Sequence, residues 1–485
     1  MAVQTLSPQP FYRSLLRGRD GLVAGQIGVR TRSIALHVLT ALLALLAIGL
    51  WCYLIAHVVD TWDGDTADRR EDVVAYYAAG RLVSEGRAVD LYDPDVLAET
   101  EHFVLGRPAG WHNGLAYLNP PFVAALFQPL THLPYGAAQA LWFALGALAV
   151  AISLVLLWPE LRRLPRRWAA VFVLASFASF PVFWSLLYGQ ISSLVLLSWV
   201  LCYRWLKDGR ELPAGLALAL VLIKPQLAVV PVLYLVTTGR WRALAGFALG
   251  AIVLVGISVA LVGPQTALVS YPMFLVESLR WSDEYGVDRT HMFGWSSFFG
   301  WALPGASTTG LLYLTGVASA LTLFAAMFVW RRHQRLGIGA MTVFSLAAAT
   351  ILVSPHLHAQ DLQILLVPAA LLIAHRRDAF ALAVPALLFL LMPLALASVN
   401  LVTPALAVAL GIITLSAAGV RIRPLKGAPS WPHDRRVALS TQASLLPVGG
   451  RTTTPPVSRS RVAWCRVRSN LSEHARDLPR LTLHR

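Results

Sequence analysis

The sequence predicts an all-α protein, a polytopic membrane helical bundle with about 12 transmembrane helices and additional short or re-entrant helices. Two observations support this fold class. Of the 485 residues, 56% are hydrophobic and only 13% are charged, whereas soluble domains carry about 45–50% apolar and about 25% charged residues. The apolar residues also form long uninterrupted runs, which are typical of membrane-spanning helices. This composition excludes a disordered chain, a collagen-like repeat and an ordinary water-soluble enzyme.

The net charge of +15 is distributed as in a membrane protein. The segment 424–485 holds 11 Lys/Arg and 3 Asp/Glu, and most other basic residues stand in short loops between apolar runs. Because Lys and Arg are enriched in cytoplasmic loops, these loops orient the bundle and do not indicate a nucleic-acid partner. The three cysteines, Cys52, Cys202 and Cys465, form no CxxC motif, so no disulfide framework is expected.

The distribution of charged residues predicts the first segments of the chain. Residues 1–33 are rich in arginine and precede a long apolar run without a small-residue cleavage pattern, so we expect a cytoplasmic N-terminal segment and a first transmembrane helix over 33–59. Residues 60–117 hold 12 Asp/Glu and 5 Lys/Arg, which predicts a first extracytoplasmic loop. The next apolar piece, 120–130, is too short to cross about 30 Å of hydrocarbon and predicts a re-entrant segment.

The membrane-embedded domain is expected over 34–420. Placing each basic loop in the cytoplasm predicts further spans at 135–158, 168–188, 191–206, 212–223, 225–236, 243–262, 309–330, 338–353, 362–375, 379–397 and 402–420. A second extracytoplasmic loop, 263–308, carries Arg280, Asp283, Asp288 and His291, and its part 277–301 is a candidate lid. The tail 421–485 is basic and rich in Pro, Ser and Thr, which predicts a disordered cytoplasmic segment able to touch anionic lipid.

Polar residues at membrane depth are costly and call for an explanation. In this topology five separated groups of them meet on the extracytoplasmic side. They are Asp72, Asn119–Pro121, Gly189–Gln190, Lys224–Gln226 and Ser354–Asp361. This convergence predicts a site at the outer face of the membrane.

The chemistry of these side chains suits a lipid-linked sugar donor. The sequence has no P-loop, GxGxxG, GxSxG or HExxH motif, and we expect no cofactor. Lys224, Arg81, His356 and His358 offer cations for a departing phosphate, and Asp72 offers a base for an attacking hydroxyl. The spacing of the histidines and Asp361 does not match a zinc site, so we expect no metal.

Each of these residues also has a structural explanation. Asp72 opens a predicted helix, where the macrodipole favours a carboxylate, and Asp361 could cap another helix. Lys224 could place its charge at the membrane interface. His356 and His358 are two residues apart, so both face one way only if their loop is irregular. Two other classes of function therefore stay open: a transporter or flippase, against which the few polar residues in the cytoplasmic half of the spans count, and a scaffold acting through its basic tail.

Five segments resemble glycosyltransferase family 87, a family of membrane-embedded type C glycosyltransferases. They are "EDVVAYYAAGRLVSEGRAVDLYDPDVL" (71–97), "LNPPFVAALFQPLTHLP" (118–134), "YGQISSLVLLSW" (188–199), "AGLALALVLIKPQLAVVPVLYLV" (214–236) and "SPHLHAQDLQILLVPAALL" (354–372). The resemblance covers roughly residues 34–420. It implies a polyprenyl-phosphate sugar donor, an inverting transfer on the extracytoplasmic face, and a glycolipid or glycan acceptor in the cell envelope.

The resemblance also implies roles for individual residues. The pattern Asp-hydrophobic-x-x-Tyr assigns the base to Asp72, with Asp63, Asp65 and Asp68 as rivals, and the late outer loop assigns donor-phosphate contact to His356 or His358. We expect substrate contacts from Tyr76, Asn119, Gln190, Gln226 and Asp361. Mannosyl-transferring members often carry a tryptophan and paired histidines after the Ser-Pro, whereas this chain has "SPHLHAQD". Mannose is the first expectation for the sugar, and arabinose or another pentose or hexose is the alternative.

Overall fold

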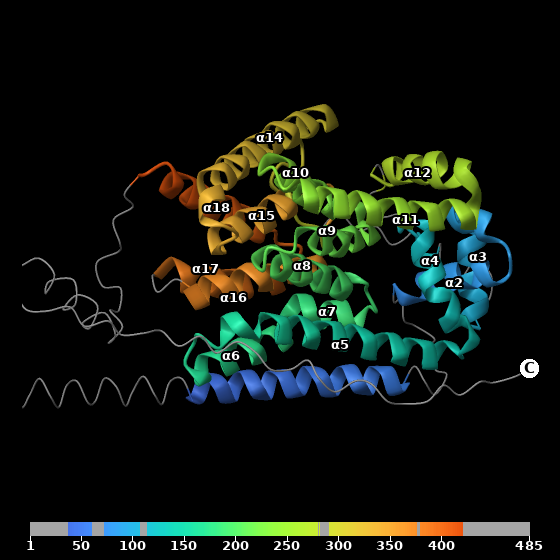
Figure 1. The fold of residues 1–485 in the computed structure, drawn as a ribbon. Coiled ribbons are helices and arrows are strands. Elements are labelled where there is room, and N and C mark those ends of the chain that lie inside the picture. Colours follow the sequence, from blue (N-terminus) through green and yellow to red (C-terminus); the bar gives the residue numbers. More distant parts are fainter. Residues whose placement is uncertain are drawn as a thin grey trace, which may run out of the picture. The chain divides into compact units, whose positions relative to one another are not determined.

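The computed structural model describes residues 37–60, 72–106, 114–279, 281, 291–375 and 379–420 (Figure 1). These residues are helical and contain no β-strand. One isolated antiparallel bridge joins Met292 and His358. The all-α membrane bundle predicted from composition is confirmed.

The bundle is built from long helices of 24 to 27 residues and a series of shorter ones. Its members are the helix His37–Asp60, α5 (Tyr135–Leu161), α6 (Arg166–Phe177), α7 (Phe180–Leu187), α8 (Ser192–Lys207), α9 (Glu211–Ala219), α10 (Val229–Thr237), α11 (Trp241–Gln265), α14 (Thr308–His333), α15 (Ala340–Val353), α16 (Leu366–His375), α17 (Ala379–Leu391) and α18 (Val402–Ala417). Short 3-10 segments join them, among them η3 (Leu220–Ile223), η4 (Pro225–Leu227), η8 (Ala359–Leu365) and η9 (Met392–Ala397).

The two predicted extracytoplasmic loops contain helices of their own. The first forms α2 (Val73–Ser84), η1 (Ala88–Tyr92) and α3 (Pro94–Val104), and it leads into α4 (Pro121–Phe127) and η2 (Gln128–His132). The second forms α12 (Tyr271–Ser278) and α13 (Trp295–Ala302). In Figure 1 helices α2, α3 and α4 gather at one end of α5 and α11. Gly80 of α2 allows this packing, because a Cβ there would lie 2.8 Å from the backbone of Phe127 in α4.

Helix length separates two kinds of apolar helix among the described residues. Five are long and apolar enough to cross a membrane, namely His37–Asp60, Tyr135–Leu161, Arg166–Leu187, Trp241–Ser278 and Thr308–His333. The other predicted spans are shorter helices. Short helices that end inside a bilayer need partners for their terminal backbone groups, and their ends are where the polar segments predicted to form the site lie.

Two predicted spans differ in shape from the expectation. The span predicted at 168–188 is broken after Phe177, and α7 starts at Phe180 with Pro181 in its first turn, where a missing N–H is tolerated. The span predicted to end at 262 continues to Ser278, past a non-helical Gly263 with φ of 79°. The start of the second loop is therefore helical.

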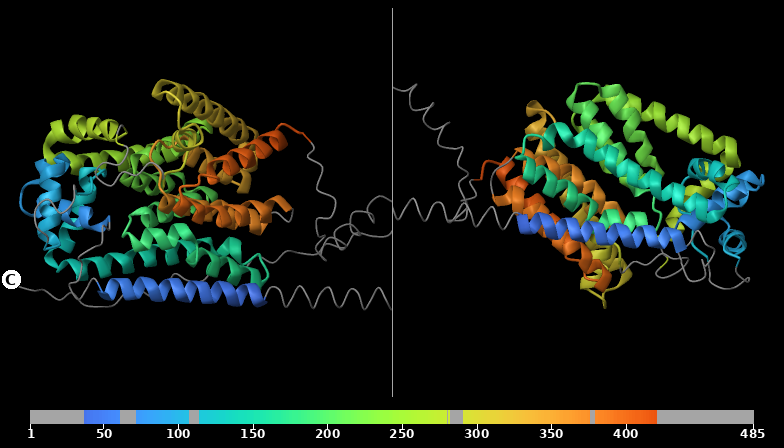
Figure 2. Two further views of the ribbon diagram at one scale, coloured as in Figure 1. Left: turned by 180° about the vertical axis from the view of Figure 1, so that it is seen from behind. Right: turned by 90° about the horizontal axis from the view of Figure 1, so that it is seen from below.

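Most of the apolar core falls into two clusters of buried side chains, and a small third cluster contains Trp281 and Met292. The larger lies within the bundle and includes Trp199 and Trp330, and the smaller lies under α2 and α4 and includes Tyr117 and Phe127. Helix α8 joins them, because Val195 belongs to the larger cluster while Ile191, just before its start, belongs to the smaller. The helix His37–Asp60 lies along α5 (Figure 2), where Trp51 packs on Phe143 with ring centroids 5.8 Å apart.

Candidate active site

Asp72 stands immediately before α2 and faces a turn from a distant part of the chain. It is the N-cap residue of α2, yet its side chain makes no capping hydrogen bond. Instead, Nε2 of Gln190 donates a hydrogen bond to Oδ2 of Asp72. Asp72 thus stands where the helix macrodipole favours a carboxylate, but the direction of its side chain is set by Gln190 and not by a capping hydrogen bond.

The turn that carries Gln190 is shaped by Gly189. This residue has φ of +62°, in the left-handed region that favours glycine, and a Cβ on it would lie 2.6 Å from Cβ of Val73. Its carbonyl oxygen accepts a hydrogen bond of 2.8 Å from Nε1 of Trp142. The Gly-Gln turn is thus pressed against the first residue of α2, and this contact brings Gln190 to Asp72.

The Gln190 side chain connects Asp72 with Lys224. Its Nε2 donates to Asp72. Its Oε1 accepts hydrogen bonds from the Tyr76 hydroxyl at 3.1 Å and from Nζ of Lys224 at 3.3 Å. Burial raises the pKa of Tyr76 well above its ordinary value, and the nearby Asp72 adds to the rise. Tyr76 therefore stays protonated and donates, which fixes which end of the amide faces Asp72.

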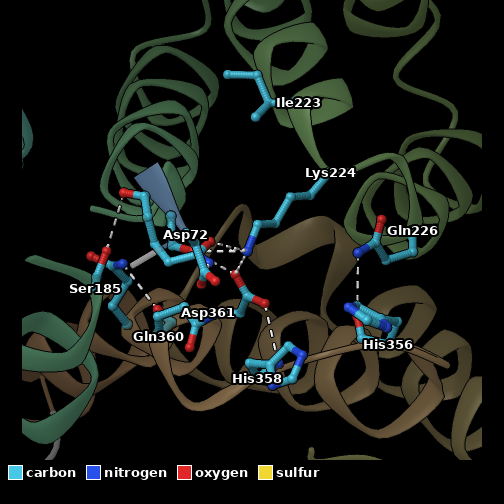
Figure 3. Close-up of polar contacts among 12 residues, drawn as sticks. Asp72, Ser185, Ile223, Lys224, Gln226, His356, His358, Gln360 and Asp361 are labelled. Carbon is cyan, nitrogen blue, oxygen red and sulfur yellow. Dashed lines mark hydrogen bonds and ion pairs between the residues drawn. The ribbon is translucent and has the colours of Figure 1, made fainter. Parts of the chain in front are cut away.

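Lys224 lies at the tip between η3 and η4 and forms a buried ion pair. Its Nζ lies 2.7 Å from Oδ1 of Asp361 and 3.1 Å from Oγ of Ser192. Ser192 also donates to Oδ1 of Asp361, at 2.6 Å. Figure 3 shows Asp72, Lys224 and Asp361 converging between the helices. With Gln190, these partners occupy all three N–H groups that a lysine has.

Two further contacts tie neighbouring segments to this group. Nδ2 of the buried Asn119 donates to the carbonyl oxygen of Ile223 at 2.9 Å, directly before Lys224. Nε2 of Gln226 donates to the carbonyl oxygen of His356 at 3.2 Å (Figure 3). Hydrogen bonds therefore join all five polar segments that the sequence singles out.

The two histidines share one side of an irregular loop. Residues 354–358 precede η8 and are not helical, and the rings of His356 and His358 meet edge to face with centroids 4.9 Å apart. Both side chains are half-buried. The backbone N–H of His358 also donates to Oδ2 of Asp361 at 3.3 Å. Two histidines two residues apart can thus act on the same ligand.

Arg81 makes its described contacts elsewhere on α2. Its Nε lies 2.6 Å from Oε1 of Glu85, and its guanidinium lies over the ring of Phe103 at 4.3 Å. The other predicted phosphate-binding residues belong to the group around Lys224 and the His356 loop, whereas Arg81 contacts the acid one turn along its own helix.

The structure adds a buried carboxyl group, that of Glu101, which no sequence motif indicates. Glu101 of α3 is fully buried; its Oε2 accepts a 3.0 Å hydrogen bond from Leu115 N, and its Oε1 has no hydrogen-bond partner within the described part of the chain. Burial raises its pKa to about 8, against the lowering effect of the Leu115 N–H, with Asp72 adding to the rise. The signal was present in the sequence, since Glu101 stands four residues from both Leu97 and Leu105, on the apolar face of the helix.

Several predicted residues lie outside the described ranges. These are the rival bases Asp63, Asp65 and Asp68, the loop residues Arg280, Asp283 and Asp288, the N-terminal segment 1–33 and the tail 421–485. Of the candidate lid, His291 is described, and Phe293 N donates to Leu357 O at 2.8 Å. This part of the second loop is therefore paired with the histidine loop. Within the described ranges, no group of three or more His, Cys, Asp or Glu side chains is placed to hold a metal ion.

Comparison with known proteins points to one family. Residues 117–355 match the model of glycosyltransferase family 87. The chain is 32% identical over 228 residues to an alpha-(1->3)-arabinofuranosyltransferase of Mycobacterium tuberculosis, covering 46% of this chain and 49% of that protein. It is 29% identical over 249 residues to a polyprenol-phosphate-mannose-dependent alpha-(1-2)-phosphatidylinositol pentamannoside mannosyltransferase of Mycolicibacterium smegmatis, covering 49% of this chain and 57% of that protein.

The matched part of the chain is limited, although it contains much of the candidate site. The chain spans about half the length of these curated relatives, and no solved structure matches it significantly. Asn119, Gln190, Lys224 and Gln226 lie inside residues 117–355, whereas Asp72 lies before that segment and His356 directly follows it. The chain is therefore similar to glycosyltransferase family 87 over residues 117–355.

Proposed function

We propose that the protein is an inverting glycosyltransferase with Asp72 as its general base. It moves a sugar from a polyprenyl-phosphate donor to a hydroxyl of a cell-envelope glycolipid or glycan, on the extracytoplasmic side of the plasma membrane. The contact between Gln190 and Asp72 is the observation that carries the proposal. The Asp72 carboxylate makes no capping hydrogen bond and is instead held by Gln190, which also contacts the buried Lys224.

In the proposed step, the base and the leaving phosphate lie on opposite faces of the transferred sugar. Asp72 accepts the proton of the acceptor hydroxyl, whose oxygen attacks the anomeric carbon from the face opposite the phosphate. The bond between the anomeric carbon and the phosphate oxygen breaks, and the polyprenyl phosphate leaves with both electrons. The transition state resembles the oxocarbenium ion of glycoside hydrolysis, so charge develops on the departing phosphate.

The histidines are the better candidates for stabilising that phosphate. Lys224 already donates to Gln190, Ser192 and Asp361, and its charge is balanced by the carboxylate. We therefore assign Lys224 to holding Gln190 and Asp361 in place, and phosphate contact to His356 and His358. Both rings are half-buried, so part of each is accessible to a ligand.

Mannose is the first candidate for the transferred sugar, and arabinofuranose is the second. One relative is named for polyprenol-phosphate-mannose dependence, and the other for arabinofuranosyl transfer. Transfer assays with polyprenyl-phosphate donors that carry either sugar distinguish between mannose and arabinofuranose.

The test is transfer from radiolabelled polyprenyl-phosphate sugars to membrane glycolipid by the purified full chain in lipid. Asp72→Asn is measured beside wild type, and Asp90→Asn, which removes an acid paired with Arg87 on the protein surface, is the matched control. We expect one sugar to be transferred by wild type and by Asp90→Asn but not by a folded Asp72→Asn protein. Undiminished transfer by Asp72→Asn would show that Asp72 is not the general base. Movement of labelled lipid across the bilayer without transfer would replace the transferase with a flippase.

A further inference from the structure

An apolar cavity of about 490 Å³ lies between the helix His37–Asp60, α6, α16 and α17. Its walls are almost entirely hydrocarbon. Side chains from all four helices contribute to them, including Leu43, Phe172, Ala369 and Phe389. Its volume falls within the roughly 300–1,000 Å³ of small-molecule sites.

The cavity extends for about the depth of one membrane leaflet. Along η8 and α16 its lining runs from Leu362 to Ile373. At about 1.5 Å per helical residue this is roughly 16 Å, which is half of the approximately 30 Å hydrocarbon thickness of a bilayer. A cavity of this length suits a single lipid chain confined to one leaflet.

One end of the cavity lies beside a charged cluster. Ile373 in its wall is two residues before His375, and Trp168 in its wall follows Arg166 and Arg167. Nε2 of His375 lies 2.7 Å from Oε2 of Glu160, and Nδ1 of His375 lies 3.2 Å from Nη1 of Arg163.

Positive charge is in surplus at this end. The buried Glu160 forms ion pairs with Lys207, with Arg204 at 3.8 Å and with Arg163 at 3.6 Å. Arg204 also pairs with Asp208 at 3.4 Å, so two carboxylates face three permanent cations, and Arg163 keeps 52% of its side chain exposed. Surplus exposed cations at a membrane interface attract anionic lipid.

The opposite end of the cavity offers no comparable place for a headgroup. The polar side chains in its wall are Ser176, Ser179 and Gln363, and each donates to a nearby backbone carbonyl oxygen: Phe172 O at 2.8 Å, Ser176 O at 2.7 Å and Gln360 O at 2.9 Å, respectively. Their hydrogen-bonding needs are met within the protein.

We propose that this cavity is a binding site for one acyl chain of an anionic phospholipid whose phosphate lies at Arg163 and His375. The acyl chain fills the apolar cavity from Ile373 toward Leu362, and the phosphate neutralises the positive charge that Glu160 and Asp208 leave uncompensated. The cavity ends at Leu362, next to Asp361 of the group around Asp72, but the proposal does not depend on the reaction proposed there.

The test uses phosphatidylglycerol with a photoactivatable group in its acyl chain, incorporated into vesicles with the full-length protein. We expect labelling of peptides from α6, α16 and α17, and several-fold less labelling with phosphatidylcholine carrying the same chain. Ala369→Phe fills the cavity and Arg163→Gln removes the exposed cation, so each should lower labelling several-fold. Leu249→Phe and Arg331→Gln, at exposed positions on α11 and α14, are matched controls and should leave it unchanged.

Three results would overturn the proposal. The first is equal labelling by the two phospholipids. The second is labelling spread over the lipid-exposed helices α11 and α14. The third is displacement of the label by polyprenyl phosphate at concentrations where unlabelled phosphatidylglycerol has no effect, which would identify the carrier lipid as the occupant. Should Ala369→Phe fail to give a monodisperse protein, Ala175→Phe narrows the same cavity from α6 and replaces it.

Discussion

Nζ of Lys224 lies 2.7 Å from Oδ1 of Asp361, and both side chains are buried. Removing one partner of a buried ion pair leaves an uncompensated charge and costs about 3–5 kcal/mol, whereas removing both can be nearly neutral.

Lys224→Met and Asp361→Asn should each lower the free energy of unfolding by about 3–5 kcal/mol. The double variant should lose clearly less than the sum of the two, because neither charge is then stranded. Denaturant unfolding of the four proteins in detergent gives the coupling energy as a double-mutant cycle. Additive losses would mean that the two charges do not stabilise each other.

Gln190→Glu should move the activity of the protein toward higher pH. A second carboxylate beside Asp72 disfavours ionisation of Asp72 and raises its pKa, so the acidic limb of the kcat profile should shift up by about one pH unit or more. The donor KM should change little, because Gln190 contacts Asp72, Tyr76 and Lys224. Gln265→Glu, at an exposed position at the end of α11, adds the same charge elsewhere and should leave the profile unchanged. If the kcat–pH profile of Gln190→Glu is not shifted, Gln190 does not contact the catalytic base.

Gly189→Ala should be more damaging than Gly209→Ala, although both glycines have positive φ. The values are 62° and 74°, so both variants carry the strain of a left-handed non-glycine residue, about 1–2 kcal/mol. A Cβ at Gly189 would also collide with Val73, whereas nothing lies within 4 Å of one at Gly209. We expect a larger drop in melting temperature for Gly189→Ala and a loss of transfer activity that Gly209→Ala does not share. Equal effects would show that the contact with Val73 is unimportant.

Glu101→Gln should make thermal stability less dependent on pH. The pKa of Glu101 is raised to about 8 in the folded protein, chiefly by burial. Between the ordinary carboxyl pKa, near 4.5, and about 8, the unfolded chain loses this proton while the folded protein keeps it. Stability from this group is therefore fully present below pH 4.5 and declines as the pH rises to 8. Between pH 5 and 9, the melting temperatures of wild type and Glu101→Gln should be similar at low pH, and the variant should be the more stable protein at high pH. Melting temperatures that differ by the same amount at every pH would contradict the raised pKa of Glu101.

The sequence predicts the bundle and its polar segments well, because both depend on the cost of placing polar groups in hydrocarbon. It predicts less well which polar groups pair with one another. The pairing of Lys224 with Asp361 joins residues 137 positions apart, and no local pattern encodes it. The orientation of Asn119 toward Ile223 O likewise depends on tertiary packing, since an amide before two prolines is compatible with several partners.

Other misses have local causes. The break between α6 and α7 follows from Pro181, a signal that a continuous apolar run conceals. The irregular path of residues 354–358, which brings the rings of His356 and His358 together, depends on pairing with the distant segment around Phe293. Glu101 was predictable in principle, because its spacing from Leu97 and Leu105 places it on an apolar helix face.

The separation of Lys224 and Asp361 along the chain also has a consequence for biosynthesis. At about 5–20 residues per second, the ribosome makes Asp361 roughly 7–27 seconds after Lys224, since 137 positions separate them. During that interval the hairpin of α9 and α10 carries an ammonium group without its carboxylate. The nascent hairpin must therefore wait in a hydrated or shielded place, and the bundle can close around this residue only after synthesis has passed Asp361, about three quarters of the way along the 485-residue chain.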